Sequence, residues 1–333
     1  MASSNSDDGT KKPQEGILNW ASPTGEFRRK PSSFRDFISK KPNARFPPEP
    51  NRYHLYVSYA CPWAHRTLIV RALKGLEDII GLSVVDYLMQ EKGWKFSTPE
   101  QTPGAIPDTV NNAQYLRELY FKAEPEYGGR FTVPTLWDKK LGTIVNNESS
   151  EIIRMFNEVF DDYLPDATKG ITYYPEHLRA EIDAINEWVY DTVNNGVYKA
   201  GFATTQQACT YEQNAHKIFE SLDRLEDILS TNEFLVGGVL TEADIRLWTT
   251  IIRFDPVYHG HFKANLKSIE KDYPNLLRWA RQIYQIPKIA DTVNMHHIKN
   301  HYYQSHKQIN PTGVVPIGNG PDLSKPVIKA QKL

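Results

Sequence analysis

Residues 53–73 read YHLYVSYACPWAHRTLIVRAL, and this stretch decides the fold of the first half of the chain. Aromatic and β-branched residues alternate over 53–59, which predicts a strand. A helix follows, with Gly75 suited to be its C-cap and apolar residues at helical spacing at positions 64, 68, 69, 72 and 73. A second strand is predicted over 82–87, so the segment forms a β-α-β unit with parallel strands and a right-handed crossover.

The residues after this unit continue the pattern of a thioredoxin-like domain. Residues 88–130 are polar and loop-like, and we interpret them as an insertion with a short helix near 112–121. Strands over 131–138 and 143–146 flank a turn and predict a hairpin, after which a helix is predicted over 148–160. The order β-α-β, insertion, β-β-α predicts a thioredoxin-like domain that spans residues 51–165.

Three further segments flank this domain. Residues 1–50 are polar and rich in Pro, which predicts an extended N-terminal arm. Residues 166–306 predict an all-helical domain, in which Thr241 and Asp244 have the spacing of a capping box and the helical period is clearest over 177–194, 210–230, 242–254 and 275–286. Residues 307–333 return to Pro and Gly and predict an extended C-terminal tail. The predicted fold class is therefore α/β plus all-α.

The composition excludes several functional classes. Lys and Arg number 39 against 40 Asp and Glu, a net charge of -1, so we expect no nucleic-acid partner. No apolar stretch approaches 18 residues and the N-terminus has no signal-peptide pattern, so we expect no membrane association and a soluble, cytoplasmic protein. Only two cysteines occur, which excludes a disulfide framework and suits a reducing compartment.

Cys61 is the strongest candidate for chemistry. It stands where the predicted strand gives way to the N-terminus of a helix, and there unpaired amides and the helix dipole favour a thiolate. The alternative is a buried, inert cysteine. Because Ala64 takes the place of a resolving thiol, an external thiol must release any mixed disulfide. Cys209 has no comparable position, and we expect ordinary packing there rather than a resolving role.

Two further motifs describe a binding site for a small peptide. Val133-Pro134 precedes a strand, where Pro is accommodated either by a cis bond that leaves the Val133 backbone able to pair with an extended ligand, or as a trans Pro on an edge strand. Glu148 and Ser149 at the next helix start offer a carboxylate to an ammonium group, and amides and a hydroxyl to a carboxylate; alternatively they are only caps. Together with a thiolate, these groups suit a zwitterionic, thiol-bearing peptide.

Histidines near the C-terminus raise the question of a metal site. His297 and His301 are spaced i, i+4 on a predicted helix, with His296 and His306 close by. No cysteine or carboxylate stands at a matching spacing, and tetrahedral zinc needs at least three protein ligands. We therefore expect no metal.

Several motifs between about residues 50 and 318 form a recognisable set: YACPWAHR at 59–66, KGW at 92–94, RFTVPTLWD at 130–138, NESSE at 147–151, NNGVYKAGFA at 194–203, RFDPVY at 253–258, HYYQSH at 301–306 and INP at 309–311. Together they resemble the glutathione transferase superfamily, and specifically its Xi class, the glutathionyl-hydroquinone reductases. The resemblance implies that the helical domain is a glutathione-transferase C-terminal domain and that the protein is a homodimer.

The resemblance also implies roles for individual residues. Cys61 would be the nucleophile, and glutathione, as co-substrate, would be held by Trp94, Arg130, Val133, Glu148 and Ser149. Tyr198 would donate or accept a proton, while Tyr258 and one of Tyr302 and Tyr303 would stabilise the thiolate; of these two we choose Tyr302. A phenol with a pKa near 10 donates hydrogen bonds at neutral pH, which suits both tasks.

These observations predict a glutathione-dependent reductase of glutathionyl-hydroquinones that works through a mixed disulfide between Cys61 and glutathione. Two alternatives stay open. One is an omega-like dehydroascorbate reductase or general deglutathionylase, which shares Cys61 but does not need the tyrosines. The other is a non-catalytic, transferase-like binding protein.

Overall fold

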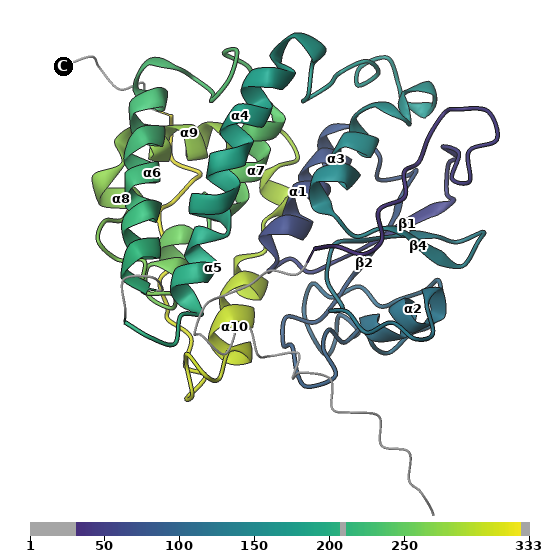
Figure 1. The fold of residues 1–333 in the computed structure, drawn as a ribbon, viewed down its shortest axis with the longest axis horizontal. Helices are drawn as coiled ribbons and strands as arrows, with labels where there is room; N and C mark the ends of the chain where they lie inside the picture. The colour runs from purple at the N-terminus through teal and green to yellow at the C-terminus, as the bar shows by residue number, and fades with distance from the viewer. Residues whose placement is uncertain (1–30, 207–210, 328–333) are drawn as a thin grey trace, which may run out of the picture.

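The structure is a computed structural model that describes residues 31–206 and 211–327. A four-stranded sheet forms the centre of its N-terminal half, with strands in the order β2-β1-β3-β4: β1 (Tyr53–Val57), β2 (Gly81–Val84), β3 (Thr135–Asp138) and β4 (Thr143–Asn146). β1 pairs in parallel with β2 and antiparallel with β3, which pairs antiparallel with β4. Figure 1 shows this sheet to one side of a separate group of helices, which confirms the predicted α/β plus all-α class.

Helix α1 (Pro62–Leu73) connects the two parallel strands. Pro62 takes its first position, where a missing amide costs nothing, so the helix begins two residues before its apolar period does. At the other end Gly75 has a φ of 70°, and the amides of Gly75 and Leu76 bond to the carbonyls of Ala72 and Arg71. This left-handed turn is the one glycine accommodates at no steric cost. Gly75 thus ends the helix as predicted, although the C-cap itself is Lys74 and Gly75 follows it.

The strands are shorter than predicted on either side of the insertion. β2 ends at Val84, and β3 begins only at Thr135 because Pro134 has no amide to give to a ladder. The Val133–Pro134 bond is cis, the first of the two alternatives. Within the insertion the single α-helix is α2 (Leu116–Ala123), and Asp108 orders the loop before it by accepting three backbone amides and the Tyr56 hydroxyl.

The described part of the N-terminal arm packs along β4 and reaches the start of helix α3 (Ser149–Glu158). Phe34 and Asn147 bond to each other in both directions, and the Asp36 amide donates to the Val145 carbonyl. Ile38 and Phe46 are buried in the core. Residues 31–50 are therefore a packed part of the sheet half rather than a loose extension.

The C-terminal half is helical, as predicted, but two of its helices are interrupted. Short π-helical turns, Tyr190–Asn194 and Phe254–Tyr258, follow α4 (Arg179–Val189) and α7 (Glu242–Ile251). The first falls within the helix predicted over 177–194, and the second begins where the helix predicted over 242–254 ends. The remaining α-helices are α5 (Gly196–Gly201), α6 (Tyr211–Thr231), α8 (Ile269–Asp272), α9 (Pro274–Tyr284) and α10 (Met295–Ser305), with 3-10 turns at Asp161–Tyr163, Glu176–Leu178 and Ala290–Thr292. None of the helices within the two described ranges has the length and apolar character needed to cross a bilayer.

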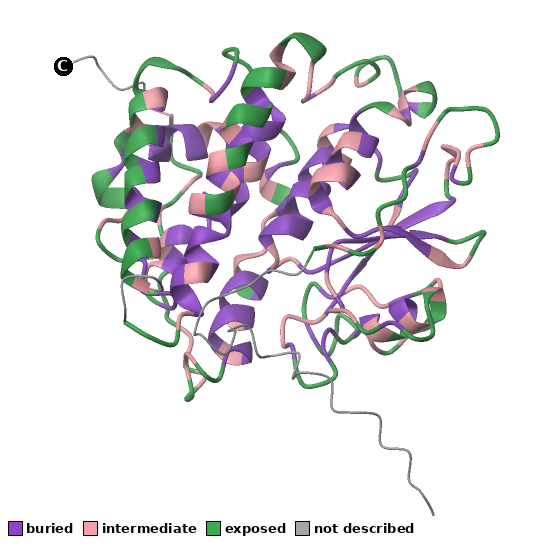
Figure 2. Ribbon diagram, in the orientation of Figure 1, coloured by how far each residue is buried: buried purple, intermediate pink, exposed green. Residues whose placement is uncertain are grey.

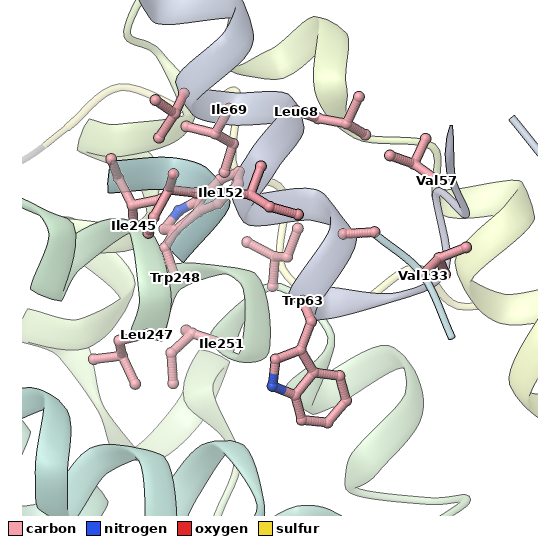
Figure 3. Packing of buried hydrophobic residues seen from close by; sticks show 14 of the residues in the cluster. Val57, Trp63, Leu68, Ile69, Val133, Ile152, Ile245, Leu247, Trp248 and Ile251 are labelled. Atoms are coloured by element: carbon pink, nitrogen blue, oxygen red, sulfur yellow. The ribbon is translucent and has the colours of Figure 1, made fainter. Parts of the chain in front are cut away.

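Helix α1 is buried between the sheet and α7 and joins the two halves. Nearly all of its residues are buried, and its ribbon is mostly purple in Figure 2. Ile69 of α1 and Ile152 of α3 meet Ile245 and Trp248 of α7 in one apolar cluster (Figure 3). Each such side chain contributes about 1.5–3 kcal/mol of transfer free energy, so both halves depend on where α1 lies.

Helix α7 begins with the predicted capping box, and its acid does more than cap. Asp244 accepts the amide and hydroxyl of Thr241, both at 2.9 Å. Its other oxygen accepts the Leu235 amide and the indole N–H of Trp279 on α9, also at 2.9 Å. Because the carboxyl is buried, its pKa is raised, and these four donors compensate for the burial.

We expect Asp244→Ala to lower the free energy of unfolding by about 3 kcal/mol or more, because it leaves buried donors without an acceptor. Asp272→Ala is the matched control: this carboxylate accepts the Ser268 amide at 2.7 Å, but it is exposed, and its loss should cost at most about 1 kcal/mol. Urea denaturation measures both variants. Equal losses would show that the Asp244 network contributes no more than a surface cap.

Candidate active site

The Cys61 thiol lies at the N-terminus of α1. Cys61 is the N-cap residue, and its sulfur accepts the Ala64 amide at 3.5 Å and lies 3.4 Å from the Val133 carbonyl oxygen. The first turn of α1 holds no acidic residue. The aligned amides of the helix therefore favour a negative charge on this half-buried sulfur.

A cavity of about 340 Å³ opens beside this sulfur. Side chains from the arm, the insertion, α1, α5 and α10 line it, so it lies between the two halves of the chain. Six of the predicted site residues are in its lining: Cys61, Trp94, Arg130, Val133, Tyr198 and Tyr302. The other three, Glu148, Ser149 and Tyr258, are not in the lining, but Glu148 bonds to Ser32 and Tyr258 to Tyr302, which are.

Three tyrosine hydroxyls meet at one side of the cavity. The Tyr302 hydroxyl forms a short hydrogen bond with that of Tyr198 and one of 3.1 Å with that of Tyr258. Burial raises the pKa of Tyr258 to about 12 and also raises the pKa values of Tyr198 and Tyr302 well above their usual range. All three are thus neutral hydrogen-bond donors in the physiological range. Tyr303 instead donates to the Pro256 carbonyl and does not line the cavity.

The backbone positions these tyrosines in a way the sequence pattern did not indicate. Tyr258 ends one π-helical turn, and Tyr198 lies in α5, directly after the other. A π-turn adds a residue to the helical repeat and so changes the direction of the side chains that follow. Both hydroxyls can thereby meet Tyr302 on α10.

Aromatic side chains form the rest of the wall. Trp63 packs on Tyr198 with ring centres 4.8 Å apart, Phe202 stacks on the same tyrosine, and Trp94 stacks on His301 at 4.8 Å. Burial lowers the pKa of His301 to about 4, so its ring is neutral. This end of the cavity suits a flat, uncharged ring.

The histidines considered as metal ligands have other partners. His297 donates to the Pro103 carbonyl, His301 donates to the Tyr87 carbonyl, and His306 bonds to His261. Within residues 31–206 and 211–327, no three His, Cys, Asp or Glu side chains are arranged to hold a metal ion. Cys209 lies outside the described residues.

The helix start at Glu148 and Ser149 directly follows Asn147, which lines the cavity. Glu148 caps α3 by accepting the Ser150 amide at 3.2 Å, and the Ser149 hydroxyl accepts from Arg66 at 3.4 Å. Ser32 of the arm, which lines the cavity, donates to the second Glu148 oxygen at 3.0 Å.

Sequence reasoning missed the contribution of the arm. Pro31, Ser32 and Ser33 all line the cavity, and Ser33 bonds to Tyr127 of the insertion at 2.9 Å. Ser32 and Glu148 are 116 residues apart, so no local pattern connects them. A short Pro-Ser-Ser run without an apolar period carries no indication that it borders a site.

Comparisons with known proteins show the family to which the chain belongs. The family model for the glutathione S-transferase N-terminal domain matches residues 60–159, and that for the C-terminal domain matches residues 210–282. The omega-like glutathione S-transferase 2 of Schizosaccharomyces pombe is 54% identical and covers 92% of this chain and 97% of its own length. The chain therefore belongs to the glutathione S-transferase family.

Two further relatives define the class within that family. The crystal structure of the glutathione S-transferase Xi from Phanerochaete chrysosporium has a TM-score of 0.86 at 59% identity, over 90% of this chain and 94% of that one. The glutathionyl-hydroquinone reductase YqjG of Escherichia coli is 55% identical over 91% of this chain and 92% of its own. Its glutathione-bound structure has a TM-score of 0.84, over 89% and 96% of the two chains. The chain is a Xi-class glutathione transferase.

The raised pKa of Tyr258 predicts a loss of stability at alkaline pH. An unfolded tyrosine ionises near pH 10 and the folded one near pH 12, so the stability this group contributes is present below pH 10 and is lost as pH rises toward 12. Between pH 9 and 11 the loss is about 1.4 kcal/mol. Tyr258→Phe has no hydroxyl to ionise and should not show this loss. The difference in the free energy of unfolding between wild type and variant, measured with urea, should therefore fall by that amount from pH 9 to pH 11. The exposed Tyr163→Phe is the control, and an equal narrowing there would contradict the assignment.

Proposed function

We propose that this protein is a glutathione-dependent reductase that removes glutathione from glutathionyl-hydroquinones. The observation that carries the proposal is the position of the Cys61 sulfur at a helix N-terminus, in the same cavity as the hydroxyls of Tyr198 and Tyr302. The cavity offers a nucleophile, neutral proton donors and an aromatic wall. The relative YqjG is named for this activity.

The glutathione half of the substrate binds beside α3 in this proposal. Glu148 meets the ammonium of the γ-glutamyl group, and the Ser149 amide and hydroxyl meet its carboxylate. The cis Val133–Pro134 segment presents its backbone to the central cysteinyl residue, while Trp94 and Arg130 bind the remainder. The glutathione-bound structure of YqjG supports glutathione as the ligand.

The reaction follows from these positions. The Cys61 thiolate attacks the sulfur of the glutathionyl thioether, a sulfur–sulfur bond forms, and the sulfur–carbon bond to the ring breaks. The electron pair stays on the departing hydroquinone framework, which Tyr198 protonates from a hydroxyl that burial keeps neutral. The Tyr302 hydroxyl bonds to those of Tyr198 and Tyr258. In this proposal Tyr258 and Tyr302 stabilise the thiolate as neutral hydrogen-bond donors.

A second glutathione completes the cycle. Its thiolate attacks the mixed disulfide, glutathione disulfide leaves, and the Cys61 thiolate is restored. Ala64 occupies the place of a resolving thiol, so the chain depends on the external thiol for this step. A cysteine nucleophile also separates this site from transferases in which Ser or Tyr only activates glutathione.

The proposal includes the organisation of the chain. We divide it into the arm, a glutathione-binding domain over 51–165, a helical domain over 166–306 and the tail; the two matched family segments lie within the middle units. We also propose a homodimer, from the resemblance, and a cytoplasmic location, since a catalytic monothiol needs a reducing compartment.

Two substitutions test the mechanism. Cys61→Ser should abolish thioether cleavage, with a loss of at least about 1000-fold in kcat. Tyr198→Phe should lower kcat by about 100-fold by slowing this cleavage, with little effect on the later attack of the second glutathione on the mixed disulfide. Turnover of a glutathionyl-hydroquinone, followed by chromatography of the released quinol, measures both. Unchanged cleavage by Cys61→Ser would sink the mechanism. A wild type that reduces dehydroascorbate but leaves the thioether intact would favour the omega-like alternative, and one inactive on both would favour the binding protein.

The role of Glu148 has a matched control on the same helix. Glu148→Gln keeps an oxygen for the α3 cap but removes the charge, so we expect KM for glutathione to rise by about tenfold with kcat nearly constant. Glu151→Gln removes a carboxylate that pairs with Arg35 outside the cavity and should leave KM unchanged. Steady-state kinetics with varied glutathione distinguish them, and parallel changes in both variants would contradict the assignment.

A further inference from the structure

A buried guanidinium bonds to the turn between β1 and α1, which carries Cys61. Arg253 follows α7, just before the second π-helical turn, and its side chain is fully buried. It reaches out of the helical half to the strand-helix junction that carries Cys61. This residue has no part in the reaction described above.

Arg253 holds the two residues that precede Cys61. Its Nε donates to the Ala60 carbonyl and one Nη donates to the Tyr59 carbonyl, both at 2.9 Å. The other Nη donates to the Thr249 carbonyl at 2.6 Å on α7. The planar fork therefore fixes the backbone at the entry to α1 relative to the helical half.

That second Nη also lies 3.1 Å from His65 Nδ1, and this contact fixes which ring nitrogen of His65 carries the proton. A guanidinium only donates, so His65 Nδ1 accepts, and His65 Nε2 donates to the Thr292 hydroxyl at 2.8 Å. Burial, and then the charge of Arg253, lower the pKa of His65 well below its usual range. His65 is thus neutral, and Arg253 carries the positive charge of this pair.

The positive charge of Arg253 meets only neutral acceptors in the part of the chain that the structure describes. Three backbone carbonyls and one neutral imidazole accept from it, and no carboxylate forms an ion pair with it among the described residues. A buried cation without a counter-ion is costly. The Cys61 sulfur, one residue beyond Ala60, is the group nearby whose ionisation would balance it.

We propose that Arg253 is a positioning residue that fixes the Tyr59–Ala60 backbone and supplies the buried positive charge that holds Cys61 as a thiolate. This inference rests on the proposed function in taking Cys61 as the nucleophile. It explains how an enzyme can keep a thiolate among apolar rings, where burial alone would favour the thiol.

The other ionisable groups around the sulfur are less suited to this task. Arg66 on α1 points to Ser149 and Asn194, and Arg130 and the exposed Glu124 lie in the insertion part of the cavity wall. Tyr198, Tyr258 and Tyr302 are neutral donors, and His301 and His306 are buried neutral rings. Arg253 is the cation bonded to the chain next to Cys61.

The test is the pH dependence of Cys61 alkylation in the intact protein. Iodoacetamide reacts with the thiolate, and mass spectrometry of the Cys61 peptide separates it from Cys209. We expect a wild-type midpoint below about 7.5. Arg253→Met should raise it by about one pH unit or more, whereas Arg253→Lys, which keeps a cation, should shift it by less than half as much. If the Met variant does not fold, Arg253→Gln takes its place.

Arg278→Met is the matched control. Arg278 on α9 is another buried arginine that donates to two backbone carbonyls. These carbonyls belong to Leu229 and Asn232 at the end of α6 and not to the turn before Cys61. Its loss should leave the Cys61 midpoint unchanged. A wild-type midpoint near 8.5 would contradict the proposed function itself. A low wild-type midpoint that is equally low in folded Arg253→Met, or a Lys variant shifted as far as Met, would overturn only the assignment of Arg253.

Discussion

The site depends on the burial of α1 between the sheet and the helical half. The sheet holds the beginning of this helix through β1, and α7 holds its flank through Ile245 and Trp248. Arg253 adds polar bonds to the turn between β1 and α1. A helix N-terminus can stabilise an anion only if its amides point at a fixed place. In the proposed mechanism, the two halves therefore have to be assembled before Cys61 can act as the nucleophile.

Local chemistry made part of the fold predictable. The strand, the Pro-initiated helix and Gly75 follow from patterns within a few residues, and so does the capping box at Thr241. The errors fall where distant contacts outweigh local preference. The π-helical turn at Tyr190–Asn194 breaks an apolar period that is otherwise continuous. The late start of β3 is instead a local effect of the proline before it. Nothing in residues 31–50 indicates that they pack on β4.

The candidate site likewise contains residues that the local sequence indicates and residues that only the folded chain brings together. A thiol at a helix start can be interpreted from sequence because strand, cysteine and helix are adjacent. The tyrosines cannot, since Tyr198, Tyr258 and Tyr302 come from three elements and meet only after folding. Their assignment relied on the family resemblance. Ser32 and Arg253 had neither a local pattern nor an assigned role, and only tertiary contacts bring them to Glu148 and to the Cys61 loop.

The charges around the cavity explain why tyrosines suit this chemistry. A thiolate and a departing hydroquinone framework are both anions, so the groups beside them must donate hydrogen bonds without becoming anions themselves. Burial achieves this by raising the pKa of the three hydroxyls, while the charge of Arg253 acts in the opposite direction on each of them. Burial is the larger effect, so the tyrosines stay protonated at physiological pH. The same cation that favours ionisation of Cys61 thus leaves its neighbours neutral, because a thiol ionises much more readily than a phenol.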